Sequence, residues 1–420
     1  MLLTHLSLTN YRNFARLDLD VPCGPLLLVG DNAQGKTSLL EAIYYLATLT
    51  SFHASNDREL ISFLVDPEPL AVARILADFR HVLPDTPLAG ANPAGAHSTG
   101  SRPAGSHRLE IRIIRDAANG APRLRKEVIL DGVQRKISEA YGVFNAVLFL
   151  PQMLSVVEGS PEDRRRYLNL SLSQVWPRYA EQLADYNRAL TQRNALLKAL
   201  GEHGGDPEQL DYWDDQLAAF GAHIIYARIQ AVQELERLAR PFHTQLTRGQ
   251  ELLRLDYQPS YDPFPTSPLQ IELPMNFAID RSGISIEKIR TGFMNQLSRT
   301  RGEEIQRGVT RIGPHRDELR FVSNGIDLGV YGSRGQGRTA VLSLKLAEVA
   351  WMREKTAQSP VLLLDEVLAE LDPARRVDLL SRLMDSEQAL LTTTDLDLFS
   401  ADYVRRARVW HIQAGQVLTG

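Results

Sequence analysis

Cysteine is almost absent from this sequence of 420 residues, in which Cys23 is the single example. Its scarcity excludes an internal disulfide framework and a metal site built from cysteines, and it suits a reducing cytoplasm. Also missing are an apolar run of the roughly 20 residues that span a bilayer and the charged start and apolar core of a signal peptide. The sequence therefore predicts a soluble, cytoplasmic protein with no membrane partner.

A general excess of positive charge is lacking as well. The 47 lysines and arginines are outnumbered by 51 acidic residues, and the net charge is −4. Any nucleic-acid surface must then be a local patch. Hydrophobic residues make up 44% of the chain and charged residues 23%, as in globular proteins. A chain of this length is expected to form two domains.

A phosphate-binding loop is the first motif that is present. The segment GDNAQGKT fits G-x-x-x-x-G-K-[ST] and lies between the buried-strand pattern LLLVG and the helical pattern KTSLLEAIYYLATL. Its glycines let the backbone wrap a phosphate, Lys36 places a positive charge on the β- and γ-phosphates, and Thr37 supplies a hydroxyl for Mg²⁺. A chance glycine turn is the alternative, but the strand–loop–helix context favours nucleotide binding. The predicted loop comprises Gly30, Asp31, Asn32, Ala33, Gln34, Gly35, Lys36 and Thr37.

Two carboxylates end another buried-strand pattern, VLLLDE. We predict that Asp365 holds Mg²⁺ and that Glu366 polarises the attacking water, with Lys36 as a second catalytic residue. The alternative is a pair of helix N-cap residues, since helical residues follow. The phosphate loop needs an acidic partner, which favours the metal-side role.

The separation of these two motifs predicts the domain organisation. Lys36 and Asp365 are most of the chain apart, although both must reach one Mg-nucleotide. The two ends are therefore expected to form one α/β head, which resembles the SMC branch of ABC-type ATPases. We expect an N-terminal part of the head over 1–158 with a flexible loop at 84–107, an inserted helical domain over 159–300 and a C-terminal part over 301–420. Two long helical patterns separated by GEHGGDPEQ predict an antiparallel hairpin in the insertion, either an arm or an ordinary subdomain.

A second glycine-rich loop, SRGQGR, precedes a later helical pattern. In ABC-type ATPases, a serine and glycine-rich signature before a helix binds the γ-phosphate held by the other subunit. Ser333 would be the donor here, with the positive end of the helix behind it. The alternative is a plain helix N-terminus. The predicted signature comprises Ser333, Arg334, Gly335, Gln336 and Gly337, and Glu370 and Asp372 in AELD resemble the loop that crosses the same dimer interface.

A histidine that senses the γ-phosphate in many ABC-type ATPases is missing. The corresponding stretch, LLTTTD at 390–395, has threonines. Their hydroxyls donate hydrogen bonds but carry no charge. We therefore predict slow hydrolysis, suited to a timer or a clamp.

The chain as a whole resembles the RecF family of bacterial recombination and gap-repair ATPases over nearly its full length. The resemblance rests on NYRNF, GKTSLLEAIYYLA, GSPEDRRRYL, GPHRDEL, SRGQGR and LLLDEVLAELD. It implies an SMC-like P-loop NTPase head that binds ATP and Mg²⁺, forms an ATP-dependent homodimer and hydrolyses ATP slowly with stimulation by DNA. Ala33, where many phosphate loops of this group have glycine, and the insertion at 84–107 depart from the family pattern.

The resemblance also implies a cellular role. It implies binding to double-stranded and gapped DNA near junctions with single strands, in gap repair, replication maintenance and the SOS response, and help in loading RecA together with RecO and RecR. The alternative is an ABC-type ATPase subunit of another complex, either a transporter or an SMC-like clamp. The large helical insertion argues against a transporter.

Further site residues follow from the resemblance. Gln152 matches the glutamine that links metal and water, and Arg12 is a candidate nucleotide contact, with an exposed strand-end arginine as the alternative. The basic clusters are DNA-binding candidates, although a charge run is usually a solvated face; two such patches would join in an ATP-dependent dimer. They comprise Arg123, Lys126, Lys136, Arg164, Arg165 and Arg166, with a further cluster at 299–311. The residues alone assign no role to His315, Arg316 and Asp317.

Overall fold

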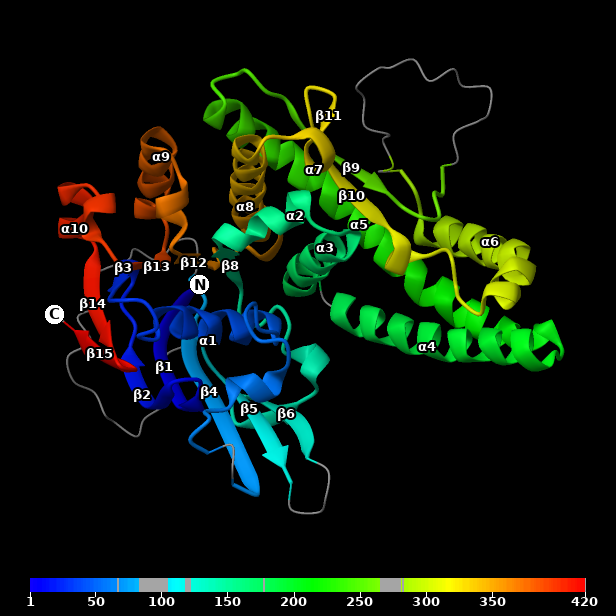
Figure 1. Cartoon of the computed structure of the whole chain (residues 1–420), viewed down its shortest axis with the longest axis horizontal. Helices are drawn as coiled ribbons and strands as arrows, with labels where there is room; N and C mark the ends of the chain where they lie inside the picture. The colour runs from blue at the N-terminus through cyan, green and yellow to red at the C-terminus, as the bar shows by residue number, and fades with distance from the viewer. Residues whose placement is uncertain are drawn as a thin grey trace. The chain divides into compact units, whose positions relative to one another are not determined.

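The computed structural model describes residues 1–65, 68–82, 105–117, 122–176, 178–264, 281 and 283–419. The chain divides into two compact units, one made of Met1–Pro151 with Met352–Gly420 and the other of Gln152–Trp351. The first and last parts of the chain thus form one unit, as predicted for the head (Figure 1). The predicted domain boundaries lie after 158 and 300, whereas the compact units divide the chain after 151 and 351. The domain boundaries stay a prediction.

A six-stranded sheet, mostly parallel, carries the nucleotide motifs in the first unit. Its order is β15-β14-β3-β13-β12-β8, and the pair β14–β15 is antiparallel. The strands are β3 (Gly24–Val29), β8 (Ala146–Phe149), β12 (Val361–Asp365), β13 (Gln388–Thr393), β14 (Arg408–Gln413) and β15 (Gln416–Thr419). Every residue of β8, β12 and β13 is buried, which explains their continuous apolar pattern. Because β3 and β12 point the same way, the segments that follow them meet at one edge of the sheet.

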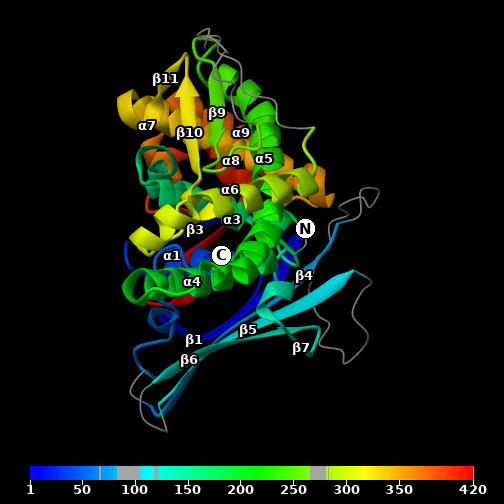
Figure 2. The same ribbon diagram turned by 90° about the vertical axis from the view of Figure 1, so that its right-hand side faces the viewer.

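A second six-stranded sheet of this unit is antiparallel, in the order β2-β1-β4-β5-β6-β7. Figure 2 shows β4, β5 and β6 side by side. The strands are β1 (Leu2–Tyr11), β2 (Phe14–Asp20), β4 (Leu70–Arg80), β5 (Ser106–Asp116), β6 (Arg123–Leu130) and β7 (Val133–Arg135). Asp131 and Gly132 both have positive φ between β6 and β7, as a tight hairpin turn requires. Most of the predicted loop at 84–107 lies outside the described residues, and its last two residues belong to β5.

Helix α1 (Lys36–Thr48) contacts β4 of the antiparallel sheet and β8, β12 and β13 of the parallel sheet, so it lies between the two sheets. Eleven of its residues are buried, which accounts for a helix that is apolar almost all round. Helices α9 (Pro373–Met384) and α10 (Ala401–Arg406) complete the unit, with 3₁₀ turns at Asp57–Leu60, Ile137–Glu139, Val367–Glu370 and Leu396–Leu398.

The unit Gln152–Trp351 is mainly helical. Its helices are α2 (Ser155–Glu158), α3 (Pro161–Val175), α4 (Tyr179–His203), α5 (Asp211–Leu246), α6 (Ile286–Arg307), α7 (Leu328–Tyr331) and α8 (Arg334–Thr356), the last of which continues past Trp351. The predicted hairpin is α4 with α5, and α6 packs against both (Figure 1). The spacing had not predicted that third helix. A small sheet, in the order β11-β10-β9, is formed by β9 (Leu253–Gln258), β10 (Glu318–Ser323) and β11 (Ile326–Asp327).

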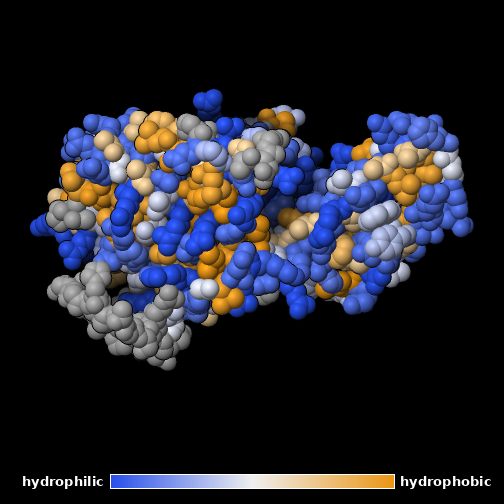
Figure 3. Space-filling view, turned by 90° about the horizontal axis from the view of Figure 1, so that it is seen from below, coloured by the Kyte–Doolittle hydropathy of each residue, from blue (hydrophilic) through white to orange (hydrophobic). Residues whose placement is uncertain are grey.

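Within the described part of the chain, no helix is long and apolar enough to cross a membrane. On the face drawn in Figure 3, apolar residues form scattered groups among hydrophilic ones. Such scattering is ordinary for a folded protein surface.

Candidate nucleotide-binding site

The phosphate loop joins β3 to α1, and its conformation depends on small residues. Gly35 has φ +114° and Ala33 has φ +63°, both in the left-handed region. A Cβ on Gly30 would lie 2.3 Å from the carbonyl oxygen of Ile412, and one on Gly35 would lie 2.6 Å from Nδ2 of Asn13. The loop backbone therefore packs against its neighbours without room for side chains at these two glycines. Ala33 adopts a conformation that costs an L-residue about 1–2 kcal/mol.

The first turn of α1 is built to receive an anion. Gly35 is its N-cap, no side chain caps it, and its first turn holds no acidic residue. The first backbone N–H groups of a helix lack partners within the helix and carry a partial positive charge. Phosphate oxygens can accept hydrogen bonds from these N–H groups, and their negative charge is attracted by the partial positive charge.

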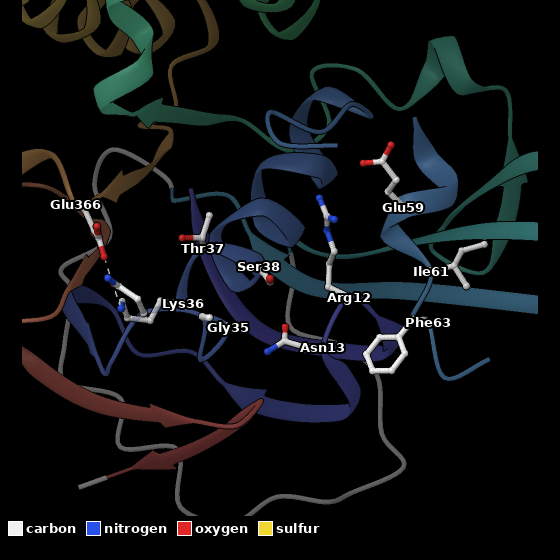
Figure 4. A pocket seen from close by; sticks show the side chains of 12 residues that line it. Arg12, Asn13, Gly35, Lys36, Thr37, Ser38, Glu59, Ile61, Phe63 and Glu366 are labelled. Atoms are coloured by element: carbon white, nitrogen blue, oxygen red, sulfur yellow. Dashed lines mark ion pairs between the residues drawn. The ribbon is translucent and has the colours of Figure 1, made fainter. Parts of the chain in front are cut away.

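Lys36 adds a full positive charge to this loop. Its side chain is 4% exposed, and Nζ donates to the carbonyl oxygens of Gly30 at 2.7 Å and Asp31 at 2.9 Å. Glu366 Oε1 lies 3.6 Å from the same nitrogen (Figure 4). The predicted cation and the predicted catalytic acid therefore face one space, although they lie in distant parts of the sequence.

Asp365 and Thr37 also meet, as predicted. Thr37 Oγ1 lies 3.0 Å from both carboxylate oxygens of Asp365, at the end of β12. A hydroxyl, a carboxylate and phosphate oxygens are the ligands that Mg²⁺ prefers, and this ion usually takes only one or two protein ligands. No group of three or more His, Cys, Asp or Glu residues in the described ranges could hold a metal ion alone. This donor set fits a Mg²⁺ ion that is bound together with a nucleotide.

Thr392 is a site residue that the sequence analysis did not single out. The parallel register places it beside Asp365, and its hydroxyl donates to Asp365 Oδ1 at 2.7 Å. The hydroxyl oxygen of Thr392 also accepts the backbone N–H of Glu366 at 3.0 Å. Glu366 has φ +53°, and its side chain is 44% exposed. Thr392 thus holds both the carboxylate of Asp365 and the backbone turn that carries the Glu366 side chain.

A pocket of about 370 Å³ opens over the loop. It is lined by Asn32, Ala33, Gly35, Lys36, Thr37, Arg12 and Glu366 from the predicted set. Asn13, Ser38, Glu59, Ile61 and Phe63 also line it (Figure 4). The side chain of Phe63 is 74% exposed. Its ring offers a flat apolar wall on the side of the pocket away from Lys36.

Arg12 enters the pocket from the turn between β1 and β2, where it has φ +52°. Its Nε and Nη2 each donate to the buried Glu41 at 2.8 Å, and Ser51 donates to the same carboxylate. The hydrogen bonds to Glu41 raise the pKa of the Arg12 guanidinium above its ordinary value. Arg12 is therefore a rigidly held cation and not a loose strand-end arginine.

Gln152 and the second glycine-rich loop belong to the unit Gln152–Trp351, in which Gln152 is exposed in the 3₁₀ turn Pro151–Leu154. At the start of α8, Ser333 Oγ accepts the N–H of Gln336 at 3.2 Å, and Gln336 Oε1 accepts the N–H of Ser333 at 3.0 Å. This reciprocal pair is a capping box. The capping box does not use the Ser333 hydroxyl proton. Ser333 can therefore cap the helix and still donate a hydrogen bond to a phosphate. Ser333, Arg334 and Gly335 are exposed.

Glu370 and Asp372 precede α9. Asp372 is the N-cap and accepts from the N–H groups of Ala374 at 3.1 Å and Arg375 at 3.0 Å, while Glu370 is exposed at the end of a 3₁₀ turn. Asp372 therefore has a structural role as a helix cap. The predicted role at a dimer interface would be additional.

The DNA-binding candidates differ in their surroundings. Arg164 is buried and donates to both oxygens of Glu318, at 2.6 and 2.8 Å. Lys126 contacts Asp57 and the carbonyl oxygen of Leu49, each at 2.8 Å. These two cations are committed to neighbouring groups of the fold, whereas Arg123, Lys136 and Arg166 are exposed. In the cluster at 299–311, Arg301 pairs with Asp211 and Asp214, and Arg307 and Arg311 pair with Glu303.

Asp317 of the GPHRDEL segment belongs to a buried polar cluster of the helical unit. Asp317 is 1% exposed and accepts from Arg228 Nη1 at 2.9 Å, from the N–H of Ser260 at 2.9 Å and from the hydroxyl of Tyr257. Arg165 donates to the carbonyl oxygen of Asp317 at 3.0 Å, and burial lowers its pKa. Asp317 thus has a structural role, since its contacts link α3, α5 and β9.

Comparisons with known proteins agree over the whole chain. A family model described as RecF/RecN/SMC N terminal domain matches residues 2–413. A DNA replication and repair protein RecF of Chloroflexus aurantiacus is 39% identical, with 100% of both chains covered. One of Enterococcus faecalis is 36% identical, covering 99% of this chain and 98% of the relative. A solved structure described as the recombination mediator protein RecF-ATP in the RecFOR pathway has a TM-score of 0.79 at 29% identity, covering 100% of this chain and 97% of that chain.

Proposed function

The chain belongs to the RecF family, and from this premise we propose that it is an ATP-dependent DNA-binding protein of recombinational gap repair, replication maintenance and the SOS response. One observation carries the proposal: Thr37 and Lys36 of the first phosphate loop face Asp365 and Glu366 from the other end of the chain. The relatives named RecF and the RecF-ATP structure support the same assignment.

Residues in and near the pocket would have distinct roles in ATP hydrolysis. The N–H groups at the start of α1 and the Nζ of Lys36 would hold the phosphates and neutralise charge in the transition state. Thr37 and Asp365, with Gln152, would hold Mg²⁺, which would neutralise negative charge on the phosphates. Glu366 accepts a proton from the attacking water, and its exposed carboxylate beside Lys36 suits that role.

Completion of the site requires a second copy of the chain. Ser333–Gly337 would bind the γ-phosphate held by that copy, with Glu370 and Asp372 at the same interface. Threonines replace the charged sensor histidine at 392–394, so turnover is slow and rises when DNA favours the paired state. RecR would be a direct partner, with RecO and RecA acting in the same pathway.

DNA binding would depend on pairing because two copies would join their exposed cationic positions in one surface. Arg123, Lys136 and Arg166 are exposed, while the whole chain carries a net charge of −4. A dimer doubles the number of phosphate contacts, and the affinity for DNA then becomes steeply dependent on salt.

The proposal is tested by DNA binding of the Glu366→Gln variant, which should retain ATP without turning it over. We would measure the fluorescence anisotropy of a gapped duplex with and without Mg-ATP at 50 and 200 mM salt, with Lys36→Ala as the matched variant that cannot hold the phosphates. At 50 mM salt, Mg-ATP should tighten binding by at least tenfold for Glu366→Gln only, and 200 mM salt should weaken that binding. Equal affinity with and without Mg-ATP would contradict the proposal.

A further inference from the structure

Glu251 lies in the connection between α5 and β9, 85 residues before Gln336 of the second glycine-rich loop. Gln336 Nε2 donates to Glu251 Oε1 at 3.2 Å. We infer that Glu251 is a positioning residue: it holds the Gln336 side chain and, through it, sets the conformation of Ser333–Gly337. The sequence motifs and the family resemblance assign no role to this carboxylate.

The side-chain amide of Gln336 contacts a donor through its oxygen and an acceptor through its nitrogen, so only one of its two flipped orientations satisfies both contacts. The N–H of Ser333 is a donor and requires Oε1, which accepts it at 3.0 Å. Glu251 is an acceptor and requires the NH₂ group. Gln336 also donates its own backbone N–H to Ser333 Oγ at 3.2 Å. The carboxylate therefore orients the amide that fixes the backbone and, indirectly, the hydroxyl of Ser333.

Glu251 is itself fixed on its other side. Its Oε2 accepts from the hydroxyl of Ser323 at 3.0 Å and lies 3.4 Å from Nε2 of His243. His243 is fully buried in α5, and its Nδ1 lies 3.1 Å from Oγ of Ser343 in α8. The side chain of Glu251 is 20% exposed. One carboxylate thus ties the glycine-rich loop to α5 and β10, which form the body of the helical unit.

The backbone around Glu251 is held independently by Asn324. Asn324 Oδ1 accepts the N–H of Leu252 at 2.9 Å, and its Nδ2 donates to the carbonyl oxygen of Gln250 at 3.0 Å. Removing this amide disturbs the same turn but leaves the Glu251–Gln336 contact in place. Asn324 therefore supplies a matched structural control.

Loss of the carboxylate frees the Gln336 amide to rotate, so that Ser333 N–H loses a preorganised acceptor. A loop that must be ordered at each encounter with a phosphate binds it less well in the transition state. The first phosphate loop lies in the other unit and keeps its own contacts, so ATP binding there should not change. The inference rests on the proposed function of Ser333 as a contact to a second copy's phosphate.

The test is steady-state ATP hydrolysis at saturating DNA for Glu251→Ala, Glu251→Gln, Asn324→Ala and Ser333→Arg. We expect Glu251→Ala to lower kcat about tenfold with KM for ATP within twofold of the parent. Glu251→Gln keeps an oxygen for Gln336 and should restore at least half of kcat, and Asn324→Ala should also keep at least half. In a Gln336→Ala background, Glu251→Ala should cause no further loss, because both changes break one connection.

Three results would overturn the inference: unchanged kcat in Glu251→Ala, an equal loss in Asn324→Ala, or a full additional loss in the Gln336→Ala background. In each of them, a strong defect in Ser333→Arg would leave the proposed function standing. If Ser333→Arg itself kept the parent kcat, the proposed function would fail, and the inference would fail with it.

Discussion

Thr37 at the start of α1 and Asp365 at the end of β12 are 328 positions apart in the sequence, yet Thr37 Oγ1 lies 3.0 Å from both carboxylate oxygens. The parallel pairing of β3 with β13 and of β13 with β12 brings the two segments to one edge of the sheet. The Asp365 carboxylate therefore has a hydroxyl donor, and hydroxyl and carboxylate oxygens are both ligands that suit Mg²⁺.

Thr392 should matter for turnover more than for ATP affinity. Thr392→Val keeps the shape of the side chain but removes the donor to Asp365 and leaves the N–H of Glu366 without its acceptor. Leaving a buried polar group without a partner lowers the free energy of unfolding by about 1–3 kcal/mol. We expect kcat to fall by at least tenfold, while KM for ATP stays within about threefold of the parent value. Thr393→Val is the matched control, because the Thr393 hydroxyl bonds only the backbone of Asp395 among the contacts described. Equal losses of kcat in the two variants would contradict the positioning role of Thr392.

Phe63 should contribute to recognition of the nucleotide base. Its exposed ring lines the pocket opposite the phosphate loop, and stacking of a base on an aromatic side chain contributes about 1–3 kcal/mol. Phe63→Ala should weaken ATP binding about 5- to 100-fold by calorimetry, while binding of inorganic triphosphate stays unchanged. Leu64→Ala, which truncates an exposed neighbour that is not among the residues lining the pocket, should leave both affinities as in the parent. A parallel loss of triphosphate binding would instead show general damage to the loop.

His315 should make the helical unit sensitive to acid. Burial lowers its pKa to about 4, while an unfolded chain has an ordinary value near 6.5. Between those two values the unfolded chain binds a proton that the folded chain does not, so the free energy of unfolding falls as pH is lowered from about 6.5 to 4. The change attributable to this group is roughly 2–3 kcal/mol.

Denaturant unfolding at pH 7.0 and 5.0 measures this contribution. His315→Gln should reduce the difference in free energy of unfolding between the two pH values, whereas His203→Gln, which alters an exposed histidine at the end of α4, should not. A pH dependence in His315→Gln equal to that of the parent would show that the buried imidazole is not responsible.

The sequence predicts the phosphate loop, Asp365, Glu366 and the assembly of the head from both chain ends, because each depends on a local pattern or on a motif's need for a partner. Thr392 depends on strand register, and the Arg12–Glu41 pair depends on a turn packing against a helix, so neither follows from spacing. The burial of Arg164 shows the same limit. Its three-arginine run suggested an open cationic surface, but Glu318 lies 154 positions away in sequence and pairs with it.

The most direct test of the account is the molar mass of Glu366→Gln in solution by light scattering, with and without Mg-ATP. The same measurement is made on the double variant that also carries Ser333→Arg. We predict a doubled mass with Mg-ATP for the single variant and no increase for the double variant, because the second glycine-rich loop would bind the phosphate of another copy. An unchanged mass of Glu366→Gln in Mg-ATP would contradict the paired mechanism and leave Ser333–Gly337 as an ordinary helix start.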